Sequence, residues 1–224
     1  MNGIREQDGG AGPQYYDKEF WRSENLKYAE PHYRLLKSAR IIRRLAGDRP
    51  LSLLDVGCGP ATLKNLLPPS VAYHGVDIAI HEDVPYLTEA DIVKAPIRVG
   101  DARFDIILAQ GFFEYVGEYQ AQKFGEISEM LADDGIFITS YVNFGHRKPM
   151  IYDRYSNVQP IQAFRNGLSR FFEIRRAFPT SHNWAHGEPN RKLVRAGNMR
   201  VNFNVPLVTP KLAVQYFFIC SPKS

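Results

Sequence analysis

The amino-acid sequence predicts an α/β protein in which a mainly parallel β-sheet is covered by helices on both faces. Apolar segments of strand length alternate with segments of helical periodicity, the pattern of a parallel sheet with crossover helices. A glycine-rich turn also follows the first buried strand, where such sheets bind ligands. With 224 residues and 44% hydrophobic residues, we expect one domain that spans residues 1–224.

The N-terminal part is predicted to be helical after a short polar start. Residues 1–14 are polar and rich in glycine, so we expect them to be disordered. Residues 15–47 form the next unit, in which Pro31 breaks the helical pattern and Gly47 ends it. The apolar residues that follow the helical period there are Phe20, Leu35, Leu36, Ala39, Ile42 and Leu45.

Residues 48–142 show the clearest alternation of strands and helices. We expect strands at residues 51–56, 71–77, 104–110 and 135–142, the last entered through a turn at 132–135. Helices are expected at residues 61–67, before Pro68 and Pro69, and at 121–131. The alternation is looser in residues 143–224, where we expect a helix at 160–172, strands at 173–178 and 211–220, and an irregular stretch at 179–210.

Charge is distributed unevenly along the chain. Residues 1–140 carry 15 Lys or Arg and 21 Asp or Glu, whereas residues 141–224 carry 13 and 3. The positive side chains of the last third are scattered among aromatic and apolar residues and form no continuous basic run. They form either a solvated face or a surface for an anionic substrate or partner, and the sequence leaves both open.

The composition also bears on the cellular compartment. No apolar segment stands near the N-terminus, and the most apolar run, residues 212–220, is far shorter than the roughly 20 residues that span a bilayer. Cys58 and Cys220 form no metal-binding pattern. We therefore expect a soluble, cytoplasmic protein without a disulfide, a metal or a membrane association.

The stretch "LSLLDVGCGPATL" at residues 51–63 indicates what the glycine turn binds. A dinucleotide fingerprint would place Gly or Ala three residues after Gly59, but Thr62 stands there. Asp55 ends the strand just before the glycines, and its carboxylate would repel a pyrophosphate. S-adenosylmethionine carries an ammonium and a sulfonium group, so the carboxylate of Asp55 would favour its binding. Asp77 lies 22 residues after Asp55, the spacing of an acid that binds ribose hydroxyls.

Five segments carry a family resemblance. The segments "LLDVGCGPATL", "YHGVDI", "EADIVKAP", "FDIILAQGFFEYV" and "MLADDGIFITS" resemble, in order and spacing, the motifs of class I S-adenosylmethionine-dependent methyltransferases. The resemblance covers about residues 15–142. It implies a Rossmann-like seven-stranded sheet in the order 3-2-1-4-5-7-6 with strand 7 antiparallel. It also implies that residues 15–47, which include "YYDKEFW", form a helical lid over the cofactor-binding core of residues 48–142.

The resemblance implies a set of site residues. Asp55, Gly57 and Gly59 would hold the amino-acid end of the cofactor, Asp77 its ribose, and Asp91 and Ile92 its adenine. The full set of implied cofactor contacts is Tyr16, Asp55, Gly57, Cys58, Gly59, Asp77, Ile78, Asp91, Ile92 and Gln110. Apart from the resemblance, we predict substrate contacts at Trp21 of the N-terminal aromatic segment and at Arg147, His182 and Trp184 of the last third, where aromatic and basic residues are mixed. Relatives often have Glu-His where this chain has Glu114 and Tyr115, and we interpret Glu114 as a structural residue that fixes a loop or caps a helix.

Histidines are the candidates for a general base. A hydroxyl acceptor must lose its proton during methyl transfer, and histidine suits neutral pH, whereas an amine acceptor needs only positioning. We predict His146 as the base because it follows the strand at 135–142, with His182 as the next candidate. His182 and His186 have the spacing of a helical metal pair, but their surroundings do not indicate a helix or a third ligand, so we expect no metal.

The function predicted is methyl transfer to a small molecule such as a natural product, glycan or lipid precursor, with oxygen preferred to nitrogen. Two alternatives remain. The basic last third favours an RNA methyltransferase, although "AQGFFEY" has no Asn-Pro-Pro-Tyr-type motif and no RNA-binding module is evident, which argues against a nucleic-acid partner. A non-catalytic scaffold subunit that retains cofactor binding is the other.

Overall fold

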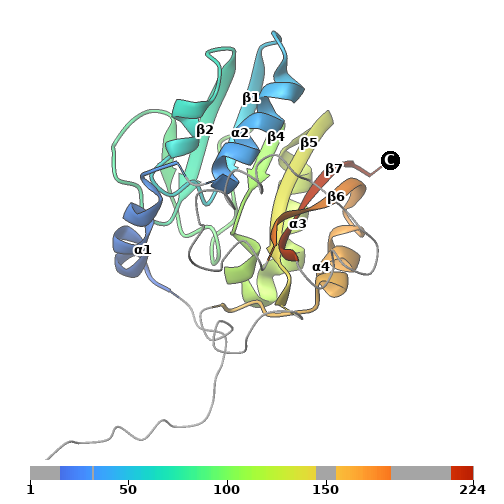
Figure 1. Cartoon of the computed structure of the whole chain (residues 1–224). Helices are drawn as coiled ribbons and strands as arrows, with labels where there is room; N and C mark the ends of the chain where they lie inside the picture. The colour runs from blue at the N-terminus through green and yellow to red at the C-terminus, as the bar shows by residue number, and fades with distance from the viewer. Residues whose placement is uncertain (1–15, 32, 145–154, 183–212, 224) are drawn as a thin grey trace, which may run out of the picture.

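A computed structural model describes residues 16–31, 33–144, 155–182 and 213–223 (Figure 1). Seven strands form one sheet in the order β3-β2-β1-β4-β5-β7-β6, which confirms the order that the resemblance implied. Strands β1 to β5 are parallel to one another, and β7 runs antiparallel to both β5 and β6. The strands are β1 (Leu51–Val56), β2 (Val71–Asp77), β3 (Leu87–Glu89), β4 (Phe104–Ala109), β5 (Leu131–Val142), β6 (Phe172–His182) and β7 (Ala213–Pro222).

Helices precede, connect and cover these strands. The α-helices are α1 (Lys18–Glu24), α2 (Tyr33–Ala46), α3 (Gln120–Met130) and α4 (Ile161–Leu168). The described 3-10 helices are η1 (Asn25–Tyr28), η2 (Thr62–Leu66), η3 (Phe113–Tyr115) and η4 (Gly117–Tyr119). Within the described ranges, no helix combines the length and the apolar character that crossing a membrane requires.

The N-terminal segment, residues 16–46, follows the sequence prediction closely. Asp17 caps α1 by accepting a hydrogen bond from the amide of Phe20 at 2.8 Å. Pro31 lies between η1 and α2, because a proline ring is incompatible with the interior of a continuous helix. Gly47 follows α2 with a φ of +53°, a left-handed conformation that glycine adopts without strain.

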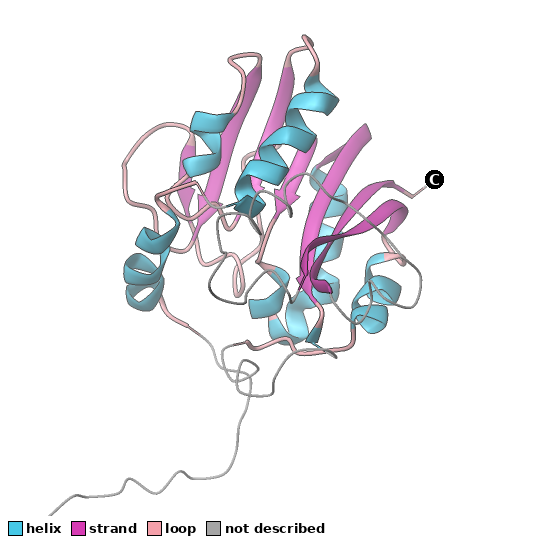
Figure 2. Cartoon of the chain, viewed as in Figure 1, coloured by secondary structure: helices cyan, strands magenta, loops and turns pink. Residues whose placement is uncertain are grey.

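Each face of the sheet has its own apolar core. On one face Ala39 and Ile42 of α2 pack with Leu53 and Ile106 of the central strands. On the other face Phe124 of α3 and Phe164 of α4 pack against strand residues that alternate with those of the first face. Figure 2 shows α2 in front of the sheet and α3 behind it. The prediction of helices on both faces is therefore confirmed.

Several expected elements differ in extent. The helix expected at 61–67 is only the 3-10 helix η2, because Pro68 holds Leu67 in an extended conformation and leaves too few residues for an α-helix. The turn expected at 132–135 lies inside β5, as an irregularity where the pairing with β4 shifts register. The helix expected at 160–172 ends at Leu168, and β6 begins at Phe172. Strand β3 was not indicated by an apolar pattern, because Leu87 is its only apolar residue.

An aromatic cluster joins α4 to the sheet. The ring of Phe164 stacks on that of Tyr141 in β5, with centroids 4.0 Å apart and an interplanar angle of 9°. Phe164 also contacts Phe113, Phe124 and Phe218 and is fully buried. This one side chain thus touches residues from η3, α3, β5 and β7.

Truncation of Phe164 should therefore destabilise the protein strongly. We expect Phe164→Ala to lower the free energy of unfolding by about 3–5 kcal/mol, because the lost ring leaves a cavity that four rigid neighbours cannot fill. Phe164→Leu should cost less, and Val158→Ala, at a site that is 42% exposed, should cost almost nothing. Urea unfolding of the three variants measures this, and a loss below about 1 kcal/mol for Phe164→Ala would show that the cluster contributes little.

Candidate functional site

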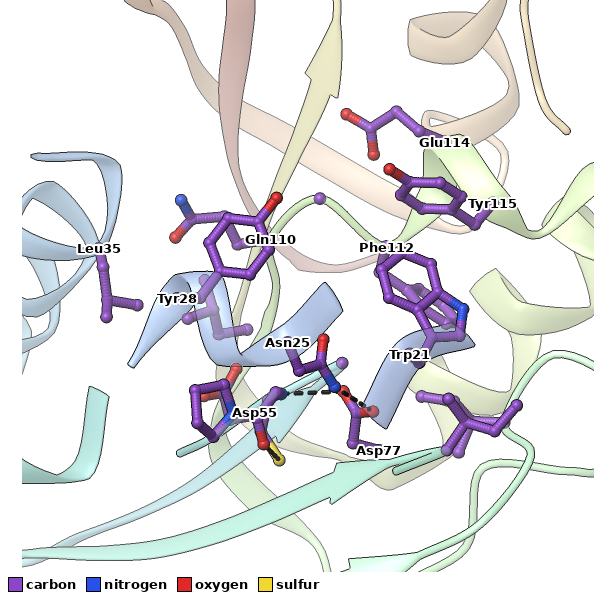
Figure 3. A pocket seen from close by; sticks show the side chains of 18 of the residues that line it. Trp21, Asn25, Tyr28, Leu35, Asp55, Asp77, Gln110, Phe112, Glu114 and Tyr115 are labelled. Carbon is purple, nitrogen blue, oxygen red and sulfur yellow. Dashed lines mark hydrogen bonds between the residues drawn. The ribbon is translucent and has the colours of Figure 1, made fainter. Parts of the chain in front are cut away.

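A cavity of about 210 Å³ lies at the carboxyl ends of the parallel strands β1, β2 and β4. Its walls come from the N-terminal segment, from the loops that follow these three strands, and from Val142 of β5 and Gln215 of β7. Its position is the one that doubly wound sheets use for ligands. Figure 3 shows Asp55, Asn25 and Asp77 together at one end, Glu114 and Tyr115 at the other, and Trp21 with Phe112 between them.

The glycine turn after β1 shapes the floor of this cavity. Gly57 and Gly59 have φ values of +73° and +54°, which non-glycine residues adopt only at a cost. The amide of Gly57 donates to the carbonyl of Val76 at 2.9 Å, so the turn is fastened to the end of β2. The two glycines thus permit a backbone path on which a ligand approaches the main chain closely.

Asp77, at the end of β2, is the most heavily bonded acid of the cavity. Its Oδ2 accepts from the amide of Gly59 at 2.8 Å, and its Oδ1 accepts from the amide of Ala79 at 3.0 Å and from Nδ2 of Asn25 at 3.1 Å. A carboxylate oxygen has two acceptor positions, so Oδ2 retains one for a further donor. Burial raises the pKa of Asp77, while these hydrogen bonds oppose the rise.

Asp55, at the end of β1, is buried beside Asp77 and has fewer partners. Of the described residues, only Tyr73 donates a hydrogen bond to its side chain, from the phenol oxygen to Oδ2 at 2.9 Å. Burial raises the pKa of Asp55 to about 7, and the charge of Asp77 contributes to the rise. A cation bound at this end would reverse both effects, because it stabilises the ionised carboxylates.

The N-terminal segment closes this acidic end. Asn25 of η1 is 5% exposed and donates to Asp77, while the hydroxyl of Thr62 in η2 donates to the carbonyl of Tyr28 at 2.9 Å. Lys18 pairs with Glu89 at the end of β3. Sequence reasoning missed Asn25, because no local pattern distinguishes a buried asparagine in a 3-10 helix from an exposed one.

A second polar group lies at the opposite end of the cavity. Glu114, in η3 after β4, accepts hydrogen bonds at Oε1 from the amide of Val142 at 3.0 Å and from Nε2 of Gln215 at 3.3 Å. Gln215 accepts from Arg34 of α2 at 3.3 Å and donates to Ser140 at 3.1 Å. Glu114 therefore ties η3 to β5 and β7, as the interpretation of a loop-fixing residue expects.

Aromatic rings line the cavity between α1 and η3. Trp21 meets Tyr115 edge to face with centroids 4.9 Å apart, and Tyr155 lies 5.3 Å from Tyr115. Tyr16 completes the group at 5.9 Å from Trp21 and 6.1 Å from Tyr115. We call Tyr16, Trp21, Tyr115 and Tyr155 the aromatic wall. Such a wall provides flat apolar surfaces for a ring-containing ligand.

Most of the predicted site residues that the structure describes line this one cavity. They are Tyr16, Trp21, Asp55, Gly57, Cys58, Gly59, Asp77, Ile78, Ile92 and Gln110. Asp91 does not line it; its Oδ1 accepts from the amide of Lys94 at 3.3 Å. His146, Arg147 and Trp184 lie outside the described residues, and of His182 only the main chain at the end of β6 is described. No group of three metal-ligating side chains occurs in the described ranges.

The comparison with known families decides the class of protein. The sequence profile of the family described as "Methyltransferase domain" matches residues 29–184, more than half of the chain. The chain belongs to this methyltransferase family. It is a class I S-adenosylmethionine-dependent methyltransferase, as the five motif segments and the strand order imply. A search of curated proteins by sequence gave no match.

Solved structures of methyltransferases share the fold at low sequence identity. The plantazolicin methyltransferase BpumL, solved with a triazolic desmethylPZN analogue and SAH, is 16% identical, with 90% of both chains covered and a TM-score of 0.59. The CcbJ methyltransferase from Streptomyces caelestis is 12% identical over 88% of this chain and 92% of that chain, at 0.59. A Haloferax volcanii complex of the Trm112 methyltransferase activator with a methyltransferase is 13% identical over 93% and 96%, at 0.62.

The cavity suits the cofactor of this family. S-adenosylmethionine is cationic at its sulfonium and ammonium groups and carries a ribose with two hydroxyl donors. The cavity offers two buried carboxyl groups at one end, of which Asp77 keeps a free acceptor position. The two carboxyl groups thus offer negative charge and hydrogen-bond acceptors that match the positive charge and the ribose hydroxyl groups of the cofactor.

The buried acids give the methyltransferase a characteristic dependence of stability on pH. The pKa of Asp55 is about 7 in the folded chain against an ordinary value of 3.8, so the folded state binds more protons between these values. The stability of the free protein should therefore fall as pH rises from about 5 to 7, by up to about 1.4 kcal/mol per pH unit for this group.

Urea unfolding at several pH values tests this dependence through the slope of stability against pH. Asp55→Asn should reduce the slope, because the amide carries no titrating proton. Phe164→Leu, which changes stability without removing an acid, should keep the wild-type slope. If Asp55→Asn and the wild type give the same slope, Asp55 does not titrate as its burial implies.

Proposed function

We propose that this protein transfers the methyl group of S-adenosylmethionine to a hydroxyl oxygen of a small molecule. The observation that carries the proposal is the two-ended cavity, in which buried acids occupy one end and an aromatic wall with Glu114 the other. When bound, S-adenosylmethionine supplies a methyl group on a positively charged sulfur. Asp77 accepts the ribose hydroxyls, and Asp55 with the glycine turn holds the amino-acid end.

The remaining cofactor contacts follow from the same orientation. Ile78 and Ile92 bound the apolar part of the cavity next to β2 and β3 and suit an adenine ring. Gln110, whose side chain accepts from Ser38 at 2.6 Å, stands at the end of β4 near the reacting centre. In this arrangement residues 15–47 act as a lid, residues 48–142 as the cofactor-binding core and residues 143–224 as the substrate side. Asp91 stays a predicted adenine contact.

The acceptor is proposed to be a small molecule rather than RNA. A cavity lined by rings and partly covered by the N-terminal segment suits a compact ligand, and the similar plantazolicin methyltransferase was solved with a desmethylPZN analogue. The described residues that line the cavity include Arg34, which would also suit an acceptor with an anionic group. A role in small-molecule biosynthesis in the cytoplasm, with Trp21, Arg147, His182 and Trp184 as substrate contacts, completes the proposal. His146, outside the described residues, stays the base that the sequence predicts.

The first expected outcome concerns ligand affinity. S-adenosylmethionine and S-adenosylhomocysteine should bind with micromolar affinity, about 8 kcal/mol, and raise the melting temperature by linkage. NAD is the matched control, because the carboxylates of Asp55 and Asp77 repel its pyrophosphate. Calorimetric titration measures all three ligands. Failure of both adenosyl compounds to bind, or equal binding of NAD, would end the methyltransferase proposal.

The second outcome concerns Asp77. Asp77→Ala should weaken S-adenosylhomocysteine binding about tenfold or more, because hydrogen bonds to a charged acceptor are worth roughly 1.5–3 kcal/mol. Asp77→Asn, which keeps one acceptor, should lose less. Asp105→Ala is the control, since Asp105 also accepts from a backbone amide, that of Ser52 at 2.7 Å, but does not line the cavity. Unchanged affinity in a folded Asp77→Ala variant would refute the ribose assignment.

A further inference from the structure

One oxygen of the buried Glu114 side chain has no partner among the described residues. Glu114 is 1% exposed and lines the cavity, and no described residue forms a hydrogen bond with its Oε2. Buried polar atoms in native proteins are nearly always bonded, because an unmade bond to a charged group costs more than a neutral one. Since Oε1 already fixes Val142 and Gln215, the loop-fixing role uses only half of the carboxyl group. The other half is available to a ligand.

The groups that face Glu114 leave it able to take up a proton. Burial raises its pKa to about 7, and its own backbone amide, the side chain of Gln215, the charge of Arg34 on α2 and the amide of Val142 limit the rise. On β5, burial and then the charge of Glu114 raise the pKa of Tyr141, so this phenol stays neutral. On β7, Gln215 is uncharged. Glu114 is therefore the described carboxyl group at this end that exchanges a proton near neutral pH.

The aromatic wall stands beside Glu114 and indicates the shape of the acceptor. Tyr115 follows Glu114 directly in η3, and Trp21 and Tyr155 pack against Tyr115. Trp21 meets Tyr115 edge to face, whereas Tyr155 is tilted by 50° against it, and neither contact is a face-to-face stack that would cover the ring faces. A planar acceptor held on this wall would place a substituent at the carboxyl group.

We propose that Glu114 is a catalytic residue that accepts the proton of an aromatic hydroxyl acceptor held on the aromatic wall. This inference rests on the proposed methyl transfer and names its acceptor class and base. The acceptor oxygen forms a bond to the methyl carbon, the carbon–sulfur bond breaks, and its electron pair stays on sulfur. The O–H proton passes to Oε2 of Glu114 and then to solvent when the product leaves.

The acidity of the acceptor explains why a ring hydroxyl fits. The phenol of tyrosine has an ordinary pKa of about 10, roughly three units above the pKa of Glu114. The pKa of the acceptor hydroxyl falls as its oxygen donates electron density to the methyl carbon, so proton transfer to Glu114 becomes favourable during the reaction. An aliphatic alcohol is far less acidic and would gain little from such a base. An amine needs no base before attack.

The test compares Glu114→Gln and Glu114→Asp with the wild type. Gln keeps an acceptor oxygen for Val142 and Gln215 but cannot take up a proton. Glu126→Gln is the matched control: Glu126 pairs with the buried Lys123 and accepts from the amide of Ile97 at 2.9 Å, so its loss destabilises the chain outside the cavity. His146→Ala tests the rival base. Melting temperatures report the folding of each variant.

The first readout is binding to the complex with S-adenosylhomocysteine. Calorimetry compares 4-methylphenol with toluene, which lacks the hydroxyl. The wild type and Glu126→Gln should prefer the phenol tenfold or more, as expected for a hydrogen bond to a charged acceptor, and Glu114→Gln should lose most of this preference. An equal preference in Glu114→Gln, or none in the wild type, would overturn the contact.

The second readout is turnover with methyl-labelled S-adenosylmethionine at saturating concentration. Because the bound cofactor keeps Asp55 ionised, Asp55 then does not contribute to the dependence of kcat/KM on pH. The acceptors are 4-methylphenol and catechol, whose hydroxyl groups stay protonated near neutral pH, with aniline and benzyl alcohol as the other classes. Glu114→Gln should lower kcat on the phenols by about 10² to 10⁴, and the fall in kcat/KM below about pH 7 should disappear. Glu114→Asp should retain the fall in kcat/KM at low pH and recover part of the rate.

The outcomes separate this inference from the proposed function. A near-normal kcat in Glu114→Gln would show that Glu114 is not the base. The same conclusion would follow if the fall in kcat/KM below about pH 7 disappeared in His146→Ala alone. Methyl transfer to aniline or benzyl alcohol but not to the phenols would overturn the proposed acceptor class. So would the absence of transfer to any of these acceptors by a protein that binds the cofactor. Failure to bind the cofactor would instead overturn the proposed function itself.

Discussion

The buried carboxylate of Asp77 is the interaction on which the site depends. It holds the amide of Gly59 in the turn after β1, the amide of Ala79 after its own strand, and the side chain of Asn25 in the N-terminal segment. A buried charge without such bonds would cost several kcal/mol. The turn after β1, the chain after β2 and the N-terminal segment therefore depend on the same carboxylate for their relative positions. The cavity floor and the segment that covers it therefore share one anchor.

Charge gives the two ends of the cavity different chemistry. Asp55 lies beside Asp77, whose charge disfavours ionisation of Asp55, a penalty that a cationic ligand removes and an anionic one increases. At the opposite end, Glu114 accepts hydrogen bonds from Val142 and Gln215, and the charge of Arg34 limits the rise of its pKa. The same fold thus attracts a positively charged donor at one end and keeps a proton acceptor at the other.

The sequence predicted the frame better than the details of the site. The glycine turn and the acids at the ends of β1 and β2 follow from local patterns, whereas the strand order follows only from the family resemblance. η2 is shorter than the expected helix because Pro68 holds Leu67 in an extended conformation. Asn25 and Gln215 could not be found, because their roles arise from contacts between residues 52 and 101 positions apart. The unpartnered oxygen of Glu114 depends on such packing as well.

A crystal structure of the complex with S-adenosylhomocysteine would show whether the two ends of the cavity bind the cofactor in this orientation. We expect the ribose hydroxyls within hydrogen-bonding distance of Asp77 and the amino-acid end at Asp55 and the glycine turn. The sulfur should face the aromatic wall and Glu114. A ligand bound outside this cavity, or one whose ribose lies at Glu114 and whose sulfur faces away from the aromatic wall, would contradict this orientation.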